Sequence, residues 1–109
     1  MDDSKDIYKE RRIELNRIFE KILGSSNVYF QPPSNVRMRY PAIVYTRIGI
    51  EPIRADNGVY KMTPEYEVVV IDPDPDSAYV FQVAQLPLCR HTRHYEQDNL
   101  NHDAFQIYY

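Results

Sequence analysis

The sequence predicts an α+β fold: a small mixed or antiparallel sheet with a long β-hairpin, flanked by an N-terminal helix and a second short helix. Three observations predict it. An apolar stripe at helical spacing lies near the N-terminus, two β-branched runs flank a turn signal, and a short helical pattern follows the second run. A chain of 109 residues is the size of one domain, so we treat 1–109 as a single domain.

The first helix is expected over residues 4–23. Its apolar positions recur at the spacing of one helix face, at Leu15, Ile18, Phe19, Ile22 and Leu23. Gly24 is a suitable terminator, because glycine readily takes the left-handed conformation that closes many helices. The mostly charged first half, residues 5–12, reads as a solvated overhang, and a short strand is expected at 28–30, before Pro32-Pro33.

The hairpin is expected from two strands around Asp56-Asn57-Gly58, residue types that accept positive φ. The first strand covers about 42–49 and the second 59–71. Pro64 marks a bulge or an edge, since proline cannot donate a ladder hydrogen bond. The run 68–71 is apolar on both faces, so we expect helices or a neighbouring subunit to cover both sides.

The alternating sequence of residues 72–76, Asp-Pro-Asp-Pro-Asp, raises the question of a metal loop or a carboxylate cluster. An EF-hand-type calcium loop would need glycine at its sixth position and glutamate at its twelfth. Those positions hold Ser77 and Val83. The residues therefore read as the boundary between a strand and a helix.

The second helix is expected from 77 to 86. Asp74 suits its N-cap and Pro75 its first helical position, while Asp76 suits the first turn, where the helix dipole favours negative charge. Two further strands are expected near 88–96 and 103–109, joined by a polar turn.

Cysteine and histidine side chains near the C-terminus are the other metal-ligand types, namely Cys89, His91, His94 and His102. In a regular strand Cys89 and His91 point to one face and His94 to the other, so they do not converge on one ion. Cys89 also lacks a setting that would lower its pKa for nucleophilic catalysis. We expect surface or interface histidines, with no catalytic residue, metal or other cofactor.

Composition narrows the class of partner. The net charge of −3 argues against a dedicated nucleic-acid binder, and no apolar run is long enough to cross a bilayer, so no membrane contact is expected. Ten tyrosines suit either a subunit interface or an aromatic core. A group of basic residues around the hairpin is better explained as a solvated strand face, balanced by Glu51, Glu65 and Glu67, than as a basic rim for an acidic partner or DNA. It comprises Arg37, Arg39, Arg47, Arg54 and Lys61.

Three stretches together resemble a known family: NVYFQPPSNVRMRYPAIVY, YEVVVIDPDPDS with the short helix and LPLC after it, and RHYEQDNLNHDAFQIYY. They are similar to the tail-terminator or tail-completion (head–tail joining) proteins of tailed bacteriophages, over about residues 15–109. The resemblance implies a virion protein of the tail or neck, assembled in the host cytoplasm. It implies a homo-oligomeric ring, commonly a hexamer, that contacts the tail tube protein and the head–tail connector, with genomic DNA passing through its lumen.

In such a ring, two regions are the expected contacts. The hairpin tip, 50–60, is long and polar at its apex. The two C-terminal tyrosines are expected to form an edge strand, to dock on a neighbouring subunit or to lie in an internal strand. The candidate interface residues are Arg47, Ile50, Arg54, Asn57, Tyr60, Tyr108 and Tyr109.

Three other functions stay open from the sequence. The nearest is a head-completion or connector adaptor protein of the neck. A small metal-dependent enzyme would use Asp72, Asp74 and Asp76 or the histidines, and a host-directed binding module would use its surface alone.

Overall fold

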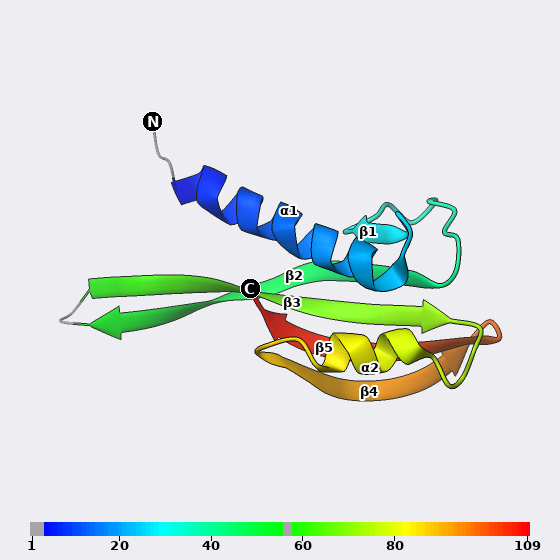
Figure 1. Ribbon diagram of the computed structural model, residues 1–109. Helices are drawn as coiled ribbons and strands as arrows, with labels where there is room; N and C mark the ends of the chain where they lie inside the picture. The colour runs from blue at the N-terminus through cyan, green and yellow to red at the C-terminus, as the bar shows by residue number, and fades with distance from the viewer. Residues whose placement is uncertain (1–3, 56–57) are drawn as a thin grey trace.

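The computed structural model describes residues 4–55 and 58–109 (Figure 1). Its elements are α1 (Ser4–Leu23), β1 (Val28–Phe30), β2 (Ala42–Ala55), β3 (Gly58–Asp72), α2 (Ala78–Ala84), β4 (Cys89–Gln97) and β5 (Leu100–Tyr108). The sheet has the order β1-β2-β3-β5-β4, in which β1 is parallel to β2 and all other neighbours are antiparallel. The expected α+β fold with a mixed sheet, a long hairpin and two flanking helices is confirmed.

Helix α1 buries the expected stripe and ends at the expected glycine. Leu15 and Phe19 are fully buried. Gly24 has φ +68°, and its N–H donates a hydrogen bond to the Glu20 carbonyl at 2.8 Å. The expectation of a solvated first half fails at its end, because the Arg12 guanidinium stacks 4.3 Å from the centre of the Phe30 ring.

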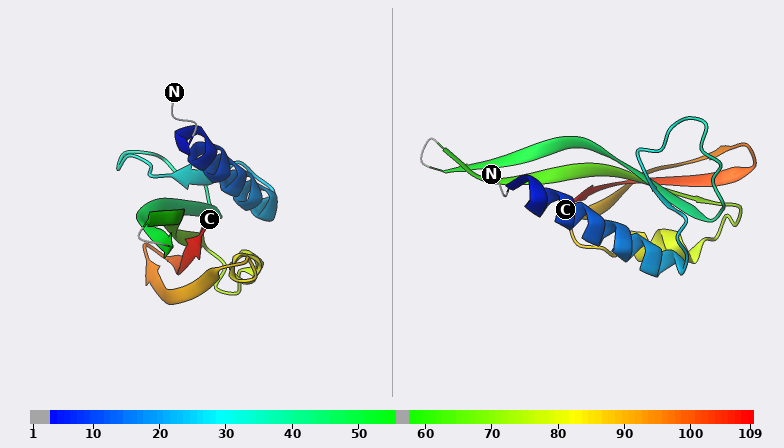
Figure 2. Two further views of the ribbon diagram at one scale, coloured as in Figure 1. Left: turned by 90° about the vertical axis from the view of Figure 1, so that its left-hand side faces the viewer. Right: turned by 90° about the horizontal axis from the view of Figure 1, so that it is seen from above.

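Both helices lie on the same face of the sheet (Figure 2). The core between them and the sheet is aromatic at its centre, where the Tyr45 ring lies 5.3 Å from Phe19, 4.9 Å from Phe30 and 5.8 Å from Tyr66. The Tyr45 hydroxyl donates to Asn16 Oδ1 at 2.7 Å, which satisfies the polar end of the buried ring. Tyrosine thus forms part of the core, which is completed by Leu23, Ile43, Val68, Val70, Val83, Phe105 and Ile107.

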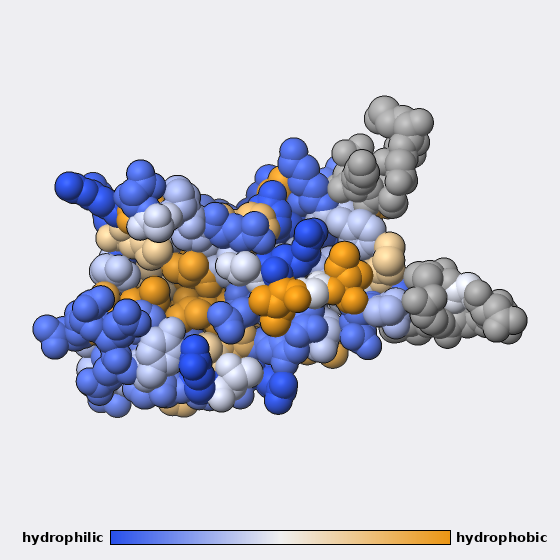
Figure 3. All heavy atoms as spheres, turned by 180° about the vertical axis from the view of Figure 1, so that it is seen from behind, coloured by the Kyte–Doolittle hydropathy of each residue, from blue (hydrophilic) through white to orange (hydrophobic). Residues whose placement is uncertain are grey.

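The opposite face of the sheet is only partly covered. Ala42, Ile71 and Ala104 are buried there, but Val44 and Val69 are half-buried. Apolar side chains gather in the middle of this face and extend toward the base of the hairpin (Figure 3). The apolar run 68–71 is therefore covered fully by the helices on one side and incompletely on the other.

The hairpin is longer than the sequence predicts. Strand β5 pairs with β3 only as far as Tyr108 opposite Glu65, and β2 and β3 continue as a two-stranded arm. The register sets Ala55 opposite Gly58, while the predicted tip at Asp56 and Asn57 lies outside the described residues. The arm extends the molecule to 50 × 27 × 24 Å and its radius of gyration to 15.2 Å, against about 13 Å for a compact domain of this size.

The two edges of the sheet differ. Strand β1 pairs with only three residues of β2, whereas β4 exposes a nine-residue edge that is largely polar and carries the charged residues Arg90, Arg93 and Glu96. A register shift between His91 and Arg93 interrupts the pairing of β4 with β5. The turn between them is Asp98-Asn99, with φ +55° and +62°, the signs that a tight hairpin turn requires at both positions.

Candidate functional site

The aspartate-proline segment forms an ordered turn and does not cap the helix. Asp72 Oδ1 accepts a hydrogen bond from the Asp74 N–H, and Asp74 Oδ1 accepts one from the Asp76 N–H, each at 2.9 Å. Helix α2 begins at Ala78, one residue after the expected start, and its N-cap is Ser77, three residues beyond the predicted Asp74, because the aspartate side chains bond to their own turn. The N-cap prediction for Asp74, with Pro75 and Asp76 in the first turn, is therefore wrong. The three residues lie between the strand and the helix.

Two histidines share one carboxylate oxygen. His91 Nε2 and His94 Nδ1 each lie 3.0 Å from Asp103 Oδ1. A regular strand period predicts these histidines on opposite faces of β4, and this prediction is wrong. The register shift after His91 adds one residue to the strand, so His94 returns to the same face.

These groups do not form a metal centre. Among the side chains that the structure describes, no three His, Cys, Asp or Glu side chains are placed to hold an ion. The third histidine, His102, stacks on Tyr95 at 4.7 Å, and its Nδ1 lies 3.1 Å from the Leu100 carbonyl oxygen. Burial raises the pKa of the Cys89 thiol to about 11, which disfavours the thiolate that nucleophilic attack requires.

The base of the arm carries an exposed apolar surface, which we call the hairpin surface and define as Ile48, Ile50 and Met62. Ile50 and Met62 come from facing strands, in register positions 50↔64 and 52↔62. Of the candidate interface residues, Arg47 and Ile50 are exposed near the base of the arm.

Two more candidates lie in the distal part of the arm. Arg54 lies in β2 and Tyr60 in β3, and Asn57 lies outside the described residues.

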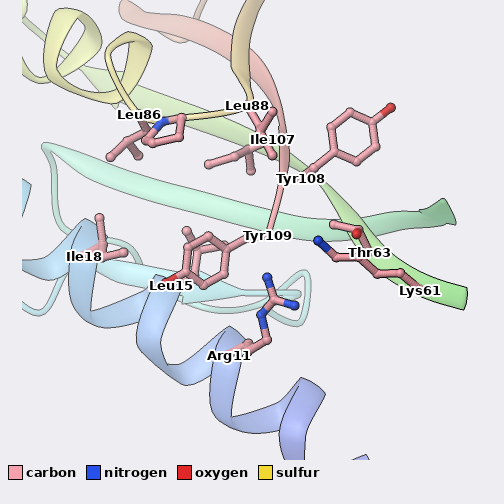
Figure 4. A pocket seen from close by; sticks show the side chains of 11 residues that line it. Arg11, Leu15, Ile18, Lys61, Thr63, Leu86, Leu88, Ile107, Tyr108 and Tyr109 are labelled. Atoms are coloured by element: carbon pink, nitrogen blue, oxygen red, sulfur yellow. The ribbon is translucent and has the colours of Figure 1, made fainter. Parts of the chain in front are cut away.

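The C-terminal candidates line a groove between α1, the end of β5 and the segment after α2 (Figure 4). The Tyr109 ring lies against α1 beside Leu15, whereas Tyr108 extends away from the helix. Tyr109 continues the pairing of β5, since its N–H donates to the Pro64 carbonyl at 3.1 Å. Its pKa is raised by burial and by a hydrogen bond with Glu14. The groove has a volume of about 250 Å³, and Leu88 is 72% exposed at its rim.

A second hollow, which the sequence analysis missed, lies between α1 and the base of the hairpin. We call it the basic hollow. Its volume is about 360 Å³, and it is lined by Tyr8, Lys9, Arg12, Phe30, Gln31, Arg47, Pro64 and Tyr66. The only sequence signal was the i, i+4 spacing of Tyr8 and Arg12 on α1, which places both on one helix face. The hollow forms only in the folded chain, where β2 places Arg47 beside Tyr8 and Arg12.

Among the basic residues around the hairpin whose side chains the structure describes, none forms an ion pair with the nearby glutamates. Arg37, Arg39, Arg47 and Lys61 are exposed. Salt bridges among the described side chains join only the histidines to Asp103. The expectation that glutamates balance this face therefore finds no direct contact in the described part of the chain.

Neither helix, over the residues described, is both long and apolar enough to span a membrane. No family model, curated protein or solved structure matches the chain.

Proposed function

We propose that this chain is a structural protein of a tailed-phage virion, whose copies form a ring at the head-proximal end of the tail. The ring ends polymerisation of the tail tube and joins the tail to the head connector. The proposal rests on the resemblance of the three sequence stretches and on one structural observation, the projecting arm with its exposed hairpin surface.

The arm is suited to contact with another protein. Two strands without a third neighbour are marginal in water, and large exposed apolar side chains are stabilised when a partner covers them. Ile50 is 49% exposed at the start of the arm, and Ile48, just before the arm leaves the body of the sheet, is 53% exposed. Stable protein contacts bury about 800 Å² per partner, and an arm and a groove on different parts of one subunit supply two separate surfaces for that purpose.

A ring requires such a pair of different surfaces. When one surface of a copy binds a different surface of the next, rotation either closes a ring or continues a filament. The groove beside Tyr109 reaches β3 at Lys61 and Thr63, the neighbours of Met62, but successive side chains of a strand point to opposite faces, so the groove and the hairpin surface are separate. They can therefore contribute to a head-to-tail contact.

Electron microscopy of the purified protein, alone and mixed with its tube protein, tests the proposal. We expect ring-shaped particles, and tubes whose lengths are limited when the protein is present. Persistent monomers that leave tube length unaltered would contradict the proposal.

A paired substitution separates the arm from a general effect of surface hydrophobicity. Ile50→Ser with Met62→Ser should reduce ring formation and tube termination while the circular dichroism spectrum stays unchanged. Phe81→Ser is the matched control, because Phe81 is also exposed but lies on α2, outside the arm. Equal effects of the two variants on ring formation would show that the hairpin surface has no specific role in it.

The neck adaptor differs from the terminator in its partner. Co-purification with the tube protein supports the terminator, and co-purification with the connector alone supports the adaptor.

A further inference from the structure

The segment 72–76 is rigid and strongly acidic. Two successive side-chain to backbone hydrogen bonds hold its turns, and two prolines restrict its backbone. Asp72 is buried, so Asp74 and Asp76 are the carboxylates that the loop presents to solvent. We call residues 73–76 the acidic loop. Because it is already ordered, little conformational entropy is lost when it binds.

The basic hollow has the complementary chemistry. Its lining combines three cations with three aromatic rings and contains no carboxylate. Lys9 and Arg47 are exposed, and Arg12 is held in place by its stacking on Phe30. Among the described side chains none of the three cations takes part in a salt bridge. The hollow thus offers unpaired positive charge beside flat apolar surface.

We infer that the acidic loop of one copy binds in the basic hollow of the next copy. The carboxylates of Asp74 and Asp76 face Lys9 and Arg47, and the rings of Pro73 and Pro75 pack on the aromatic lining. The loop combines carboxylates with proline rings, and the lining combines cations with aromatic rings, as in the aromatic-lined grooves that bind proline-rich segments in other proteins.

A second copy is the occupant because the two surfaces cannot meet within one molecule. The acidic loop lies at the end of the sheet remote from the arm, and the first half of α1 lies on the side of the arm (Figures 1 and 2). Complementary surfaces at separate places on one chain produce a head-to-tail contact between copies. This inference rests on the proposed ring and specifies the charges that set its direction.

The contact should depend on salt. Charge pairs at a rim are screened over a Debye length of about 8 Å at 0.15 M salt and about 3 Å at 1 M. We therefore expect the dissociation constant to rise when salt is raised across this range. Electrostatic complementarity also selects the partner surface, because like charges placed opposite each other are repelled.

Reciprocal charge reversal tests the inference. The loop variant carries Asp74→Lys and Asp76→Lys, and the hollow variant carries Lys9→Glu and Arg47→Glu. Arg12 is left unchanged because it packs on Phe30. Sedimentation velocity at low salt should show at least about a tenfold weaker self-association for each variant alone. An equimolar mixture should recover wild-type association, because each reversed loop then meets a reversed hollow.

Two control variants remove simpler explanations. Glu67→Lys with Glu96→Lys changes the net charge as the loop variant does, at exposed positions elsewhere on the sheet, and should leave association near wild type. Asp2→Asn with Asp3→Asn removes the charges of two other acidic residues of the sequence, which tests whether any loss of carboxylates weakens association. It should likewise have no effect.

The outcomes separate this inference from the proposed function. If the wild type forms rings and ends tubes, but the loop variant associates as the Glu67/Glu96 control does, the inference is overturned and the proposed function stands. The same holds if the mixture does not recover association. If the wild type neither associates nor limits tube length, both fail.

Discussion

Replacing Phe19 by alanine tests the packing of α1 on the sheet. Phe19 is fully buried, and its ring meets the Tyr45 ring edge-on at a centroid distance of 5.3 Å. Phe81 on α2 has the same side chain but is 66% exposed. The pair of variants Phe19→Ala and Phe81→Ala therefore removes identical atoms from a covered and an uncovered position.

The expected cost differs widely between the two positions. Truncating a buried phenylalanine to alanine costs about 3–5 kcal/mol, from lost transfer free energy and the cavity left behind. The free energy of unfolding expected for a chain of 109 residues is about 5–16 kcal/mol. Phe19→Ala therefore removes a large fraction of the stability. Exposed substitutions usually change stability by less than about 0.5 kcal/mol, which is the expectation for Phe81→Ala.

Urea and thermal unfolding, followed by circular dichroism, measure both variants. At roughly 4 °C per kcal/mol, Phe19→Ala should lower Tm by about 12–20 °C, and Phe81→Ala should leave it almost unchanged. A loss below about 1 kcal/mol for Phe19→Ala would refute the packing of α1 described above. A loss for Phe81→Ala as large as that for Phe19→Ala would show instead that α2 presents a different face to the sheet.

Three further predictions concern the turn, the thiol and the shared carboxylate. Asn99→Val should destabilise the fold by about 1–2 kcal/mol in urea unfolding, because φ is +62° there, whereas Asn99→Gly should cost nothing. Burial raises the pKa of Cys89 from 9.0 to about 11, so alkylation at pH 8 should be about 100-fold slower than in the urea-unfolded chain. Folding favours the neutral thiol, so its contribution to the free energy of unfolding is present below pH 9 and is lost as the pH rises through about 11. The free energy of unfolding of Cys89→Ala should therefore fall less than that of the wild type over this pH range. Asp103→Ala should cost about 1–3 kcal/mol in thermal unfolding, because His91 and His94 both lose their acceptor, and an unchanged Tm would contradict the shared contact.

Local patterns predicted the elements well. The spacing of Leu15 and Phe19 and the position of Gly24 predicted α1, since both reflect interactions within a few residues along the chain. Turn residues likewise predicted the position of the hairpin, although its strands run further than their apolar content suggests. The extra length is polar on much of its surface, which weakens the strand signal.

The errors arose where distant parts of the chain decide local geometry. The register shift in β4 depends on its pairing with β5, so the strand period alone placed His94 on the wrong face. The start of α2 depends on whether aspartate side chains bond to the helix or to their own turn, and both are compatible with the same residues. The basic hollow combines Lys9 and Arg47, which are far apart in sequence and become neighbours only in the folded chain.

The two edges of the sheet limit how copies of this protein can meet. A long flat edge strand can pair with strands of other molecules and lead to fibrous aggregates. In this sheet, charged residues and a bulge interrupt the edge strand β4, and the other edge strand, β1, is too short to serve as a template. Backbone pairing across copies is thus disfavoured at both ends of the ladder. Contacts between copies, such as the one proposed above, would therefore have to be made by side chains and not by backbone pairing.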